Sequence, residues 1–221
     1  FQGCTGLTTT GDDEYIFPET AVNIGNYAFD GCTALTGKLP ATLESIGTGA
    51  FKNCISITGE VIINEAITGM SQYAFDGCTG ITSIYVPTSV TSLEYRCFAN
   101  CTSLTTLTLP AGLNYHYSVP GAAYYGAFQG DTAICDITII GEGQLHSEGE
   151  EYAPWKVGSD AGNEVTVKIG EGVTEIPAEA FQSCSKLVSV NIPSTVTTIG
   201  DYAFQGCTGL TTTGDDEYIF P

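Results

Sequence analysis

Apolar and polar positions along this chain follow a template that returns about every 23 residues. The unit that begins at Phe181 has the sequence FQSCSKLVSVNIPSTVTTIGDYAF, in which the apolar Leu187, Val190 and Ile192 precede Pro193. Alternation of apolar and polar residues over so short a segment predicts a β-strand with one face inward. Proline ends that strand because it cannot donate a hydrogen bond to a continuing ladder. The wider apolar spacing after Pro193 predicts a helical or 3₁₀ turn on the opposite side.

Phenylalanine opens each unit, and these anchor residues fall at positions 1, 29, 51, 75, 98, 128, 181 and 204. The interval of 53 residues after Phe128 is long enough for two units. Strands are expected there at Ile137–Ile139 and Val165–Ile169, where apolar residues alternate again. With that interval divided, the sequence contains about eight units in one period.

Two kinds of irregularity interrupt the template. The unit from Phe29 is one residue shorter than the Phe181 unit, and the unit from Phe51 is one residue longer. Longer insertions lie near residues 8–14, 114–125 and 141–163. Long loops on a rigid scaffold often carry function, so these insertions are candidates for binding.

A single unit of this length cannot bury its own apolar side chains, whereas stacked copies can. Units of 20 to 29 residues with the pattern L-x-x-h-x-h, where h is apolar, are the signature of leucine-rich repeats. The sequence therefore predicts one continuous repeat solenoid over residues 1–221. Short parallel strands are expected on one face, with turns, 3₁₀ segments or short helices on the other.

The units closely resemble the BspA-like leucine-rich repeats, a family of bacterial and protist surface proteins. The family unit I-G-x-x-A-F-x-x-C-x-x-L-x-x-I-x-I-P is matched from Ile199 to Leu210 and from Ile24 to Leu35. The resemblance covers nearly the whole chain and fails only in the three insertions. It implies a secreted or displayed protein, with adhesion to host proteins or other cells, and it brings no catalytic residues.

The first 18 residues, Phe1 to Pro18, return letter for letter as Phe204 to Pro221, at an offset of 203 residues. So long an identical repeat predicts that the chain is one period of a tandem array. A free-standing solenoid needs polar terminal repeats, so a chain that opens and stops within a unit is expected to continue end to end. The first hypothesis is therefore a structural repeat unit of a long extracellular filament or stalk. The alternative is an adhesin that recognises a host protein or glycan through its insertion loops.

Charge narrows the range of partners. The formal net charge is −19, from 25 acidic residues against 6 Lys and Arg. That balance opposes nucleic-acid binding and adhesion to anionic lipid, both of which need basic side chains. No stretch approaches the 18 apolar residues of a membrane span, so no membrane insertion is expected. An acidic chain with little lysine fits an extracellular or cell-surface location.

Most of the cysteines stand three residues after an anchor phenylalanine, and we call this set the cysteine ladder. Equivalent positions of stacked coils point in parallel, whereas a disulfide needs Cβ atoms turned toward each other. We therefore expect buried free thiols that pack as small apolar groups. Asp131 takes the cysteine position in the Phe128 unit and is expected to break the ladder. The ladder comprises Cys4, Cys32, Cys54, Cys78, Cys101, Cys184 and Cys207.

The duplicated segment carries an acidic cluster, Asp12, Asp13 and Glu14, which recurs as Asp215, Asp216 and Glu217. Several carboxylates could hold Ca²⁺, which prefers hard oxygen ligands. The spacing matches no EF-hand or nonapeptide calcium repeat, so a solvated acidic bulge is the other interpretation. No other cofactor is indicated by the sequence.

The other two insertions offer candidate contact residues. His146, Glu150 and Trp155 lie in the longest insertion, which could be a binding loop, a contact with a neighbouring array or a flap packed on its own solenoid. The insertion near residues 114–125 contains Tyr115, Tyr117 and Tyr124, and tyrosine-rich loops suit contacts with protein or glycan. The same tyrosines suit packing against the convex face of the solenoid.

The sequence indicates no enzyme. The two histidines, His116 and His146, leave every serine and cysteine without a recognisable catalytic partner. Neither a G-x-S-x-G nucleophile elbow nor a phosphate-binding loop is found.

Overall fold

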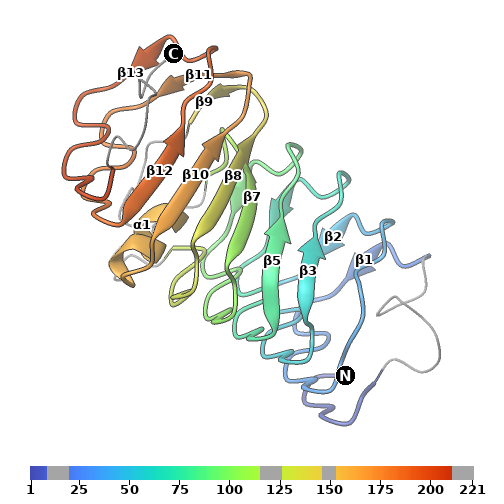
Figure 1. Cartoon of the computed structure of the whole chain (residues 1–221). Helices are drawn as coiled ribbons and strands as arrows, with labels where there is room; N and C mark the ends of the chain where they lie inside the picture. The colour runs from blue at the N-terminus through green and yellow to red at the C-terminus, as the bar shows by residue number, and fades with distance from the viewer. Residues whose placement is uncertain (9–19, 115–125, 146–152, 211–221) are drawn as a thin grey trace, which may run out of the picture.

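The computed structural model describes residues 1–8, 20–114, 126–145 and 153–210. In these residues the chain winds into coils stacked along one axis, and the N- and C-terminal coils lie at opposite ends of the stack (Figure 1). The predicted repeat solenoid is confirmed.

One side of the solenoid is a sheet of six parallel strands, one from each of successive coils in the described part of the chain. The register pairs equivalent residues, so that Ile137 lies beside both Leu107 and Val167. Ile137 and Ile139 point into the core, and the strands predicted at residues 137–139 and 165–169 are confirmed. In spatial order the strands are β12 (Leu187–Asn191), β10 (Val165–Ile169), β8 (Asp136–Ile140), β7 (Thr106–Pro110), β5 (Ile81–Tyr85) and β3 (Gly59–Ile62).

A second set of short parallel strands covers another side, where the sequence predicted helical or 3₁₀ turns. In the Phe181 unit, Thr198–Ile199 forms strand β13 beside β11 (Val173–Ile176). An extended backbone lets neighbouring coils exchange hydrogen bonds, as when Gly47 N donates to Ile24 O at 2.8 Å. A helical turn would instead use those groups within one coil. These strands are β1 (Asn23–Ile24), β2 (Ser45–Ile46), β4 (Gly69–Met70), β6 (Ser92–Leu93), β9 (Gly143–Gln144), β11 (Val173–Ile176) and β13.

The third side consists of turns that contain the anchor phenylalanines. There too the backbone joins successive coils, since Phe51 N donates to Ala74 O and Phe75 N donates to Cys97 O, at 2.8 and 2.7 Å. Tight turns require left-handed backbone on both sides of the anchor, with φ of 57° at Tyr73 and 80° at Gly77 around Phe75. Main-chain hydrogen bonds therefore join successive coils on all three sides of the solenoid.

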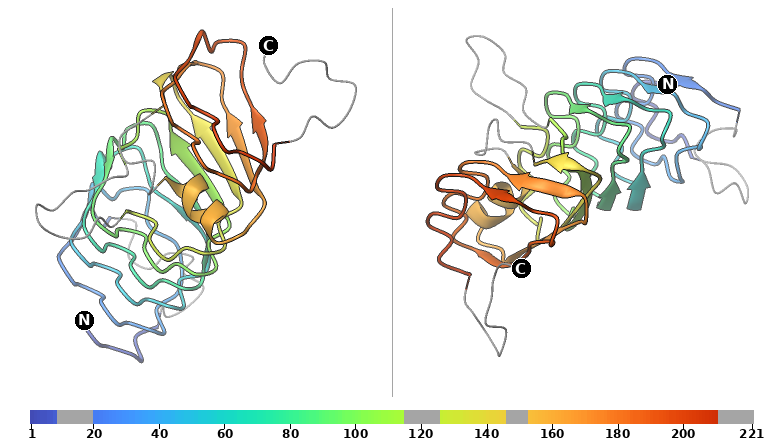
Figure 2. Two further views of the ribbon diagram at one scale, coloured as in Figure 1. Left: turned by 90° about the vertical axis from the view of Figure 1, so that its left-hand side faces the viewer. Right: turned by 90° about the horizontal axis from the view of Figure 1, so that it is seen from above.

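The centre of the solenoid holds a column of stacked aromatic rings, which we call the anchor column. The Phe51 and Phe75 rings lie 5.1 Å apart and nearly parallel, and the Phe75 and Phe98 rings lie 5.5 Å apart. Phe29 continues the stack toward the N-terminus at 5.7 Å from Phe51. Rings at these separations bury large apolar areas and gain from offset stacking. Figure 2 shows from two further sides the coil stack that encloses this column.

We expect Phe75→Ala to lower the free energy of unfolding by about 3–5 kcal/mol, because it empties a fully buried site between two rings. The matched control is Phe1→Ala, since Phe1 belongs to the same column but is 72% exposed. The control should cost less than about 1 kcal/mol. Denaturant titration of both variants checks the comparison, and equal losses would contradict the role assigned to the column.

Candidate functional site

The longest insertion does not present its tryptophan to a partner. Trp155 lies in helix α1 (Pro154–Asp160) and is only 1% exposed. Its Nε1 donates to Ala180 O at 2.7 Å, and its ring centre lies 4.9 Å from that of Phe181. Trp155 therefore occupies the anchor column in the unit between Phe128 and Phe181. A role as an exposed contact anchor is wrong, and the alternative of packing on its own solenoid is confirmed.

Helix α1 fits between coils because its residues leave room for their neighbours. Pro154 stands in the first turn, where its missing N–H costs nothing. Gly158 lies so close to Ile134 O that an added Cβ would collide with this carbonyl. Ser159 Oγ accepts a hydrogen bond from Lys186 N at 3.1 Å. The sequence did contain the signal, because Trp155 and Gly158 keep the spacing of an anchor and its ladder cysteine.

Because Trp155 is the single tryptophan of the chain, its fluorescence reports on this position directly. We expect blue-shifted emission that is protected from iodide quenching, followed by a red shift when denaturant unfolds the protein. Free N-acetyltryptophanamide is the control for full exposure. Quenching as fast as that of the free compound would show that Trp155 is available to a partner after all.

The thiols of the cysteine ladder act as hydrogen-bond donors as well as small apolar packing groups. Five ladder thiols donate to the main chain of the preceding coil. Cys54 Sγ donates to Phe29 O and Cys78 Sγ donates to Phe51 O, both at 3.0 Å, and Cys32, Cys101 and Cys207 make equivalent bonds. Burial raises the pKa of Cys54 to about 12 and that of Cys78 well above its usual range. These thiols stay protonated and act as donors. All nine cysteines of the chain are free.

Burial along the ladder depends on the presence of neighbouring coils. Five members are buried, namely Cys32, Cys54, Cys78, Cys101 and Cys184. Cys4 is exposed and Cys207 is half-buried, so the expectation of a buried thiol is wrong for Cys4 and only partly met for Cys207. Both belong to end coils of the described residues, where a coil covers one side only. Off the ladder, Cys97 fills a buried alanine position and Cys135 is half-buried.

Asp131 stands where the Phe128 unit lacks its ladder cysteine, and it is fully buried. Its Oδ1 accepts a hydrogen bond from Cys101 N at 2.7 Å, while Oδ2 has no hydrogen-bond partner within the described residues. Burial raises the pKa of the Asp131 carboxyl well above its usual range, against the opposing effect of the Cys101 hydrogen bond. The nearby charge of Asp76 adds to the rise. The protonated form of the Asp131 carboxyl is therefore the one that burial favours at this position of the ladder.

Asp131 should make the stability of the protein depend on pH. Its folded-state pKa lies above the unfolded value of about 3.9, so ionisation opposes folding. Stability should therefore fall as pH rises from about 4 toward the folded-state pKa. We expect Asp131→Asn, which keeps an acceptor for Cys101 N, to be more stable than the parent at pH 7 and to depend less on pH.

Denaturant midpoints measured between pH 4 and pH 7 check this expectation. The control is Asp160→Asn, because the Asp160 side chain is 56% exposed and its removal should leave the pH dependence intact. An unchanged slope in the Asp131→Asn variant would show that the buried carboxyl does not set the pH dependence.

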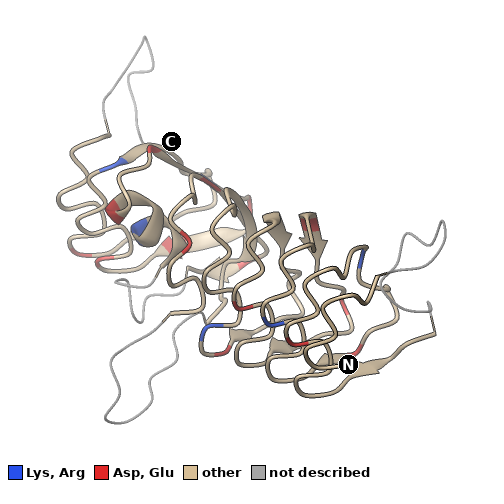
Figure 3. Cartoon of the chain, turned by 90° about the horizontal axis from the view of Figure 1, so that it is seen from below, with Lys and Arg blue, Asp and Glu red and all other residues tan. Residues whose placement is uncertain are grey.

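Three basic residues of the described coils, Lys52, Arg96 and Lys168, are paired with acidic residues on neighbouring coils. Figure 3 shows the few basic positions among acidic ones. Asp76, almost fully buried, lies 3.7 Å from Lys52 Nζ and 3.3 Å from an Arg96 nitrogen. It also accepts a hydrogen bond from Asn100 Nδ2 at 2.7 Å. Burial, together with a hydrogen bond to Tyr95, raises the pKa of the adjacent Tyr73 to about 12. The contacts of this cluster join three coils, so its role is to stabilise the stack.

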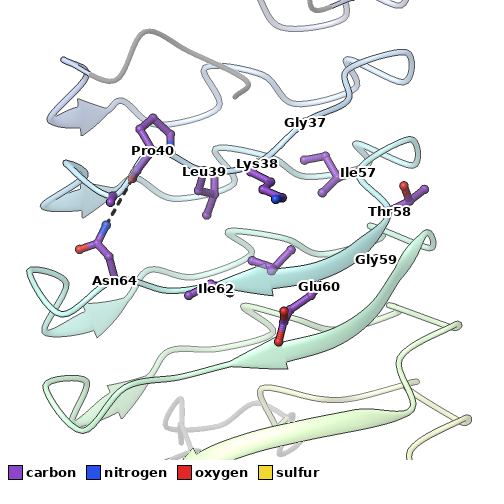
Figure 4. A pocket seen from close by; sticks show the side chains of 12 residues that line it. Gly37, Lys38, Leu39, Pro40, Ile57, Thr58, Gly59, Glu60, Ile62 and Asn64 are labelled. Carbon is purple, nitrogen blue, oxygen red and sulfur yellow. Dashed lines mark hydrogen bonds between the residues drawn. The ribbon is translucent and has the colours of Figure 1, made fainter. Parts of the chain in front are cut away.

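A groove opens on the six-stranded sheet beside β3, and we call it the β3 groove. It has a volume of about 660 Å³ and lies between residues 37–41 of one coil and 57–64 of the next. Leu39, Ile57 and Val61 supply an apolar floor, and Lys38 and Glu60 stand at its rim. Figure 4 shows these side chains, which come from the coil before β3 and from β3 and its approach. Sequence reasoning missed the groove, although the shortened Phe29 unit marks its position.

The remaining candidate site residues lie outside the described residues. They are the acidic cluster Asp12, Asp13 and Glu14 with its copy Asp215, Asp216 and Glu217, and the loop residues Tyr115, Tyr117, Tyr124, His146 and Glu150. Among the residues that the structure describes, no group of three or more His, Cys, Asp or Glu side chains could hold a metal ion. No helix in the same residues is long and apolar enough to cross a membrane.

The family model described as BspA type Leucine rich repeat region matches residues 1–127 and 161–214, in six copies. The unmatched stretch between these ranges contains Trp155 and α1, where the unit departs most from the template. None of the curated proteins matches the chain.

Several solved structures are similar to this chain. A leucine-rich repeat protein of T. pallidum (TpLRR) is 21% identical with a TM-score of 0.50, over 86% of this chain and 83% of that one. A leucine-rich repeat protein of Bacteroides ovatus is 23% identical with a TM-score of 0.40, over 96% and 67%. A leucine rich cell surface protein of Faecalibacterium prausnitzii is 21% identical with a TM-score of 0.39, over 96% and 73%. At such identities the likeness concerns the fold alone, and the T. pallidum structure supports the solenoid.

Proposed function

This chain belongs to the BspA-type leucine-rich repeat family, and on that basis we propose that it forms one period of a long cell-surface filament. Family and fold together make it a repeat module for binding or for structure. Members of the family are typically non-enzymatic, and we infer that this chain acts without catalysis. A cell-surface location is supported by the family and by the acidic composition.

The observation that carries the filament proposal is that one heptapeptide, FQGCTGL, makes two different contacts. As residues 1–7 it packs against the coil that follows it, with the Phe1 ring 5.5 Å from the Phe29 ring. As residues 204–210 it packs against the coil that precedes it, with the Phe204 ring 5.1 Å from the Phe181 ring. Both ring pairs are stacked. The same sequence therefore has one face suited to a preceding coil and another suited to a following coil.

Hydrogen bonds follow the same division. Cys32 Sγ donates to Phe1 O at 3.1 Å, and Cys207 Sγ donates to Phe181 O at 3.0 Å. Main-chain donors point the other way, toward the following coil, since Gly3 N donates to Asp30 O at 2.7 Å. If residues 204–210 of one period served as residues 1–7 of the next, both sets of bonds would be made. The coils could then continue without an interruption.

This proposal is tested with a chain of three tandem 203-residue periods, imaged by electron microscopy beside a single period. Eight coils at about 4.8 Å predict that each added period lengthens a continuous rod by about 40 Å, before curvature. A matched control carries a flexible glycine-serine insert at each period boundary and should appear as separate beads. Beads in the chain without inserts would overturn the proposal, as would a reconstruction in which the two heptapeptide copies fail to superpose under the axial repeat.

Recognition of a host protein or glycan through the insertion loops stays a prediction for His146, Glu150, Tyr115, Tyr117 and Tyr124. It does not extend to Trp155, whose side chain is used inside the solenoid. A calcium site at the acidic cluster likewise stays a prediction. Neither is required for the array, which rests on contacts between coils.

A further inference from the structure

We propose that the Asp131 side chain is a proton-dependent latch between two coils, closed when its carboxyl is protonated and opened when the carboxyl ionises. The latch joins the turn that begins at Phe98 to the coil that begins at Phe128. In the closed form the carboxyl holds both ends of that turn, because it accepts from Cys101 N and donates to Phe98 O. The latch lies within one period and does not depend on the array.

In the regular coils the carbonyl of an anchor phenylalanine accepts two hydrogen bonds. Phe51 O accepts from Cys54 N of its own turn at 3.1 Å and from Cys78 Sγ of the next coil at 3.0 Å. Phe75 O accepts in the same way from Cys78 N at 3.1 Å and from Cys101 Sγ at 3.4 Å. The ladder side chain of one coil therefore lies against the anchor carbonyl of the coil before it.

Phe98 departs from this pattern, although the residue is fully buried. Its turn does not close on itself, because Cys101 N donates to Asp131 Oδ1 at 2.7 Å and not to Phe98 O. The next coil supplies no thiol, since Asp131 takes the ladder position there. Within the described residues Phe98 O thus has no donor, and Asp131 Oδ2 has no partner. These two oxygens lie where the ladder places a donor beside an acceptor, and one proton between them satisfies both.

Only the protonated carboxyl can make both contacts. A carboxylic acid has one oxygen that accepts and one hydroxyl that donates, whereas a carboxylate only accepts. An ionised Asp131 would place a negative oxygen against the Phe98 carbonyl without a proton between them. Buried polar groups without partners are costly, and charged ones more so. Burial raises the pKa of Asp131 well above its usual range, in agreement with a closed form that is neutral. Separation of the two coils lets water reach the carboxylate.

The coils before Asp131 disfavour its ionisation. Asp76 is negatively charged, already paired with basic side chains, and its charge raises the pKa of Asp131 further. The other titratable groups that interact with Asp131 there are the Cys97 and Cys101 thiols. Burial, and then the charge of Asp131, raise the pKa of both thiols well above their usual range, so both stay neutral.

The coil after Asp131 supplies no compensating cation within the described residues. Gly158 takes the ladder position in that coil and has no side chain. The basic residues of α1 and β10 are engaged with other carboxylates, since Lys156 pairs with Asp160 and Lys168 lies 3.8 Å from an acidic residue of β8. A proton is therefore the partner that remains for the second oxygen of Asp131.

The test is the rate at which N-ethylmaleimide labels individual thiols of the folded protein between about pH 5 and pH 8, measured by mass spectrometry of its peptides. Cys101 lies at the latch, and Cys54, an equally buried ladder thiol two coils away, is the internal control. A solvated Asp131 has an ordinary pKa of about 3.9, so opening should become about tenfold easier per pH unit up to the folded-state pKa.

The ratio of Cys101 to Cys54 labelling should follow this rise, because the dependence of the maleimide reaction on pH affects both thiols alike. A ratio that stays constant would overturn the proposal. Equal acceleration of both thiols would overturn it too, because it would show unfolding of the whole solenoid and not a local latch.

Two variants identify the titrating group. In Asp131→Asn the amide can accept from Cys101 N and donate to Phe98 O at every pH, and Asp131→Cys restores the regular ladder residue. We expect the labelling ratio to be independent of pH in both, while Asp160→Asn keeps the rise of the parent. A rise that persists in both Asp131 variants would show that another group controls the opening.

Infrared spectroscopy tests the protonation itself. The difference between the parent and Asp131→Asn should contain the C=O band of a protonated carboxyl, and this band should vanish at the pH where the labelling ratio levels off. Absence of the band at pH values where the ratio still rises would contradict the latch.

Discussion

The structure depends on one constraint, which is that a coil can bury its anchor ring only against the coils on either side. The Phe75 ring is fully buried because Phe51 and Phe98 stack on its two faces. Where a coil covers one side only, the same position is largely exposed, as at Phe1. Stability is therefore shared between neighbours, as in other quasi-one-dimensional proteins. The contacts between coils therefore contribute more to the stability of the fold than any single coil does by itself.

The position three residues after each anchor shows how much variation this arrangement accepts. Cysteine there fills a small space and donates to the carbonyl of the preceding anchor. Asp131 keeps one hydrogen bond, from Cys101 N, and accommodates burial through a raised pKa. Gly158 fits the same small space because it has no side chain, and this lets α1 approach Ile134. Each replacement is compatible with the space and the hydrogen bonds left by the coils beside it.

Regular stacking also explains where the β3 groove lies. In the described residues the paired strands of the six-stranded sheet end at β3 on the N-terminal side, next to the coil whose unit is one residue short. Residues 37–41 of that coil and 57–64 of the next border the groove. A change of one residue in the length of a unit thus has its effect where two coils meet.

Much of this architecture could be predicted from the sequence, because burial recurs with the period of the coil. Positions such as Phe75, Cys78 and Ile137 must be apolar or small in each unit, so the anchors, the ladder and the strands of the six-stranded sheet were visible as a pattern. What the pattern could not decide were features that depend on the neighbouring coil. The second set of strands forms because extended segments can make main-chain hydrogen bonds to the neighbouring coil. The spacing of apolar residues does not show whether these bonds form within one coil or between two.

Trp155 illustrates the same limit. The sequence suggested a contact loop, because this tryptophan lies in a long insertion. Only the stacked coils showed that the Trp155 ring completes the anchor column. The β3 groove was equally hidden, although the missing residue was visible, because a gap exists only between two coils. The sequence alone determined what each coil buries. The tertiary structure decided what lies between the coils, since the space between two coils depends on the geometry of both.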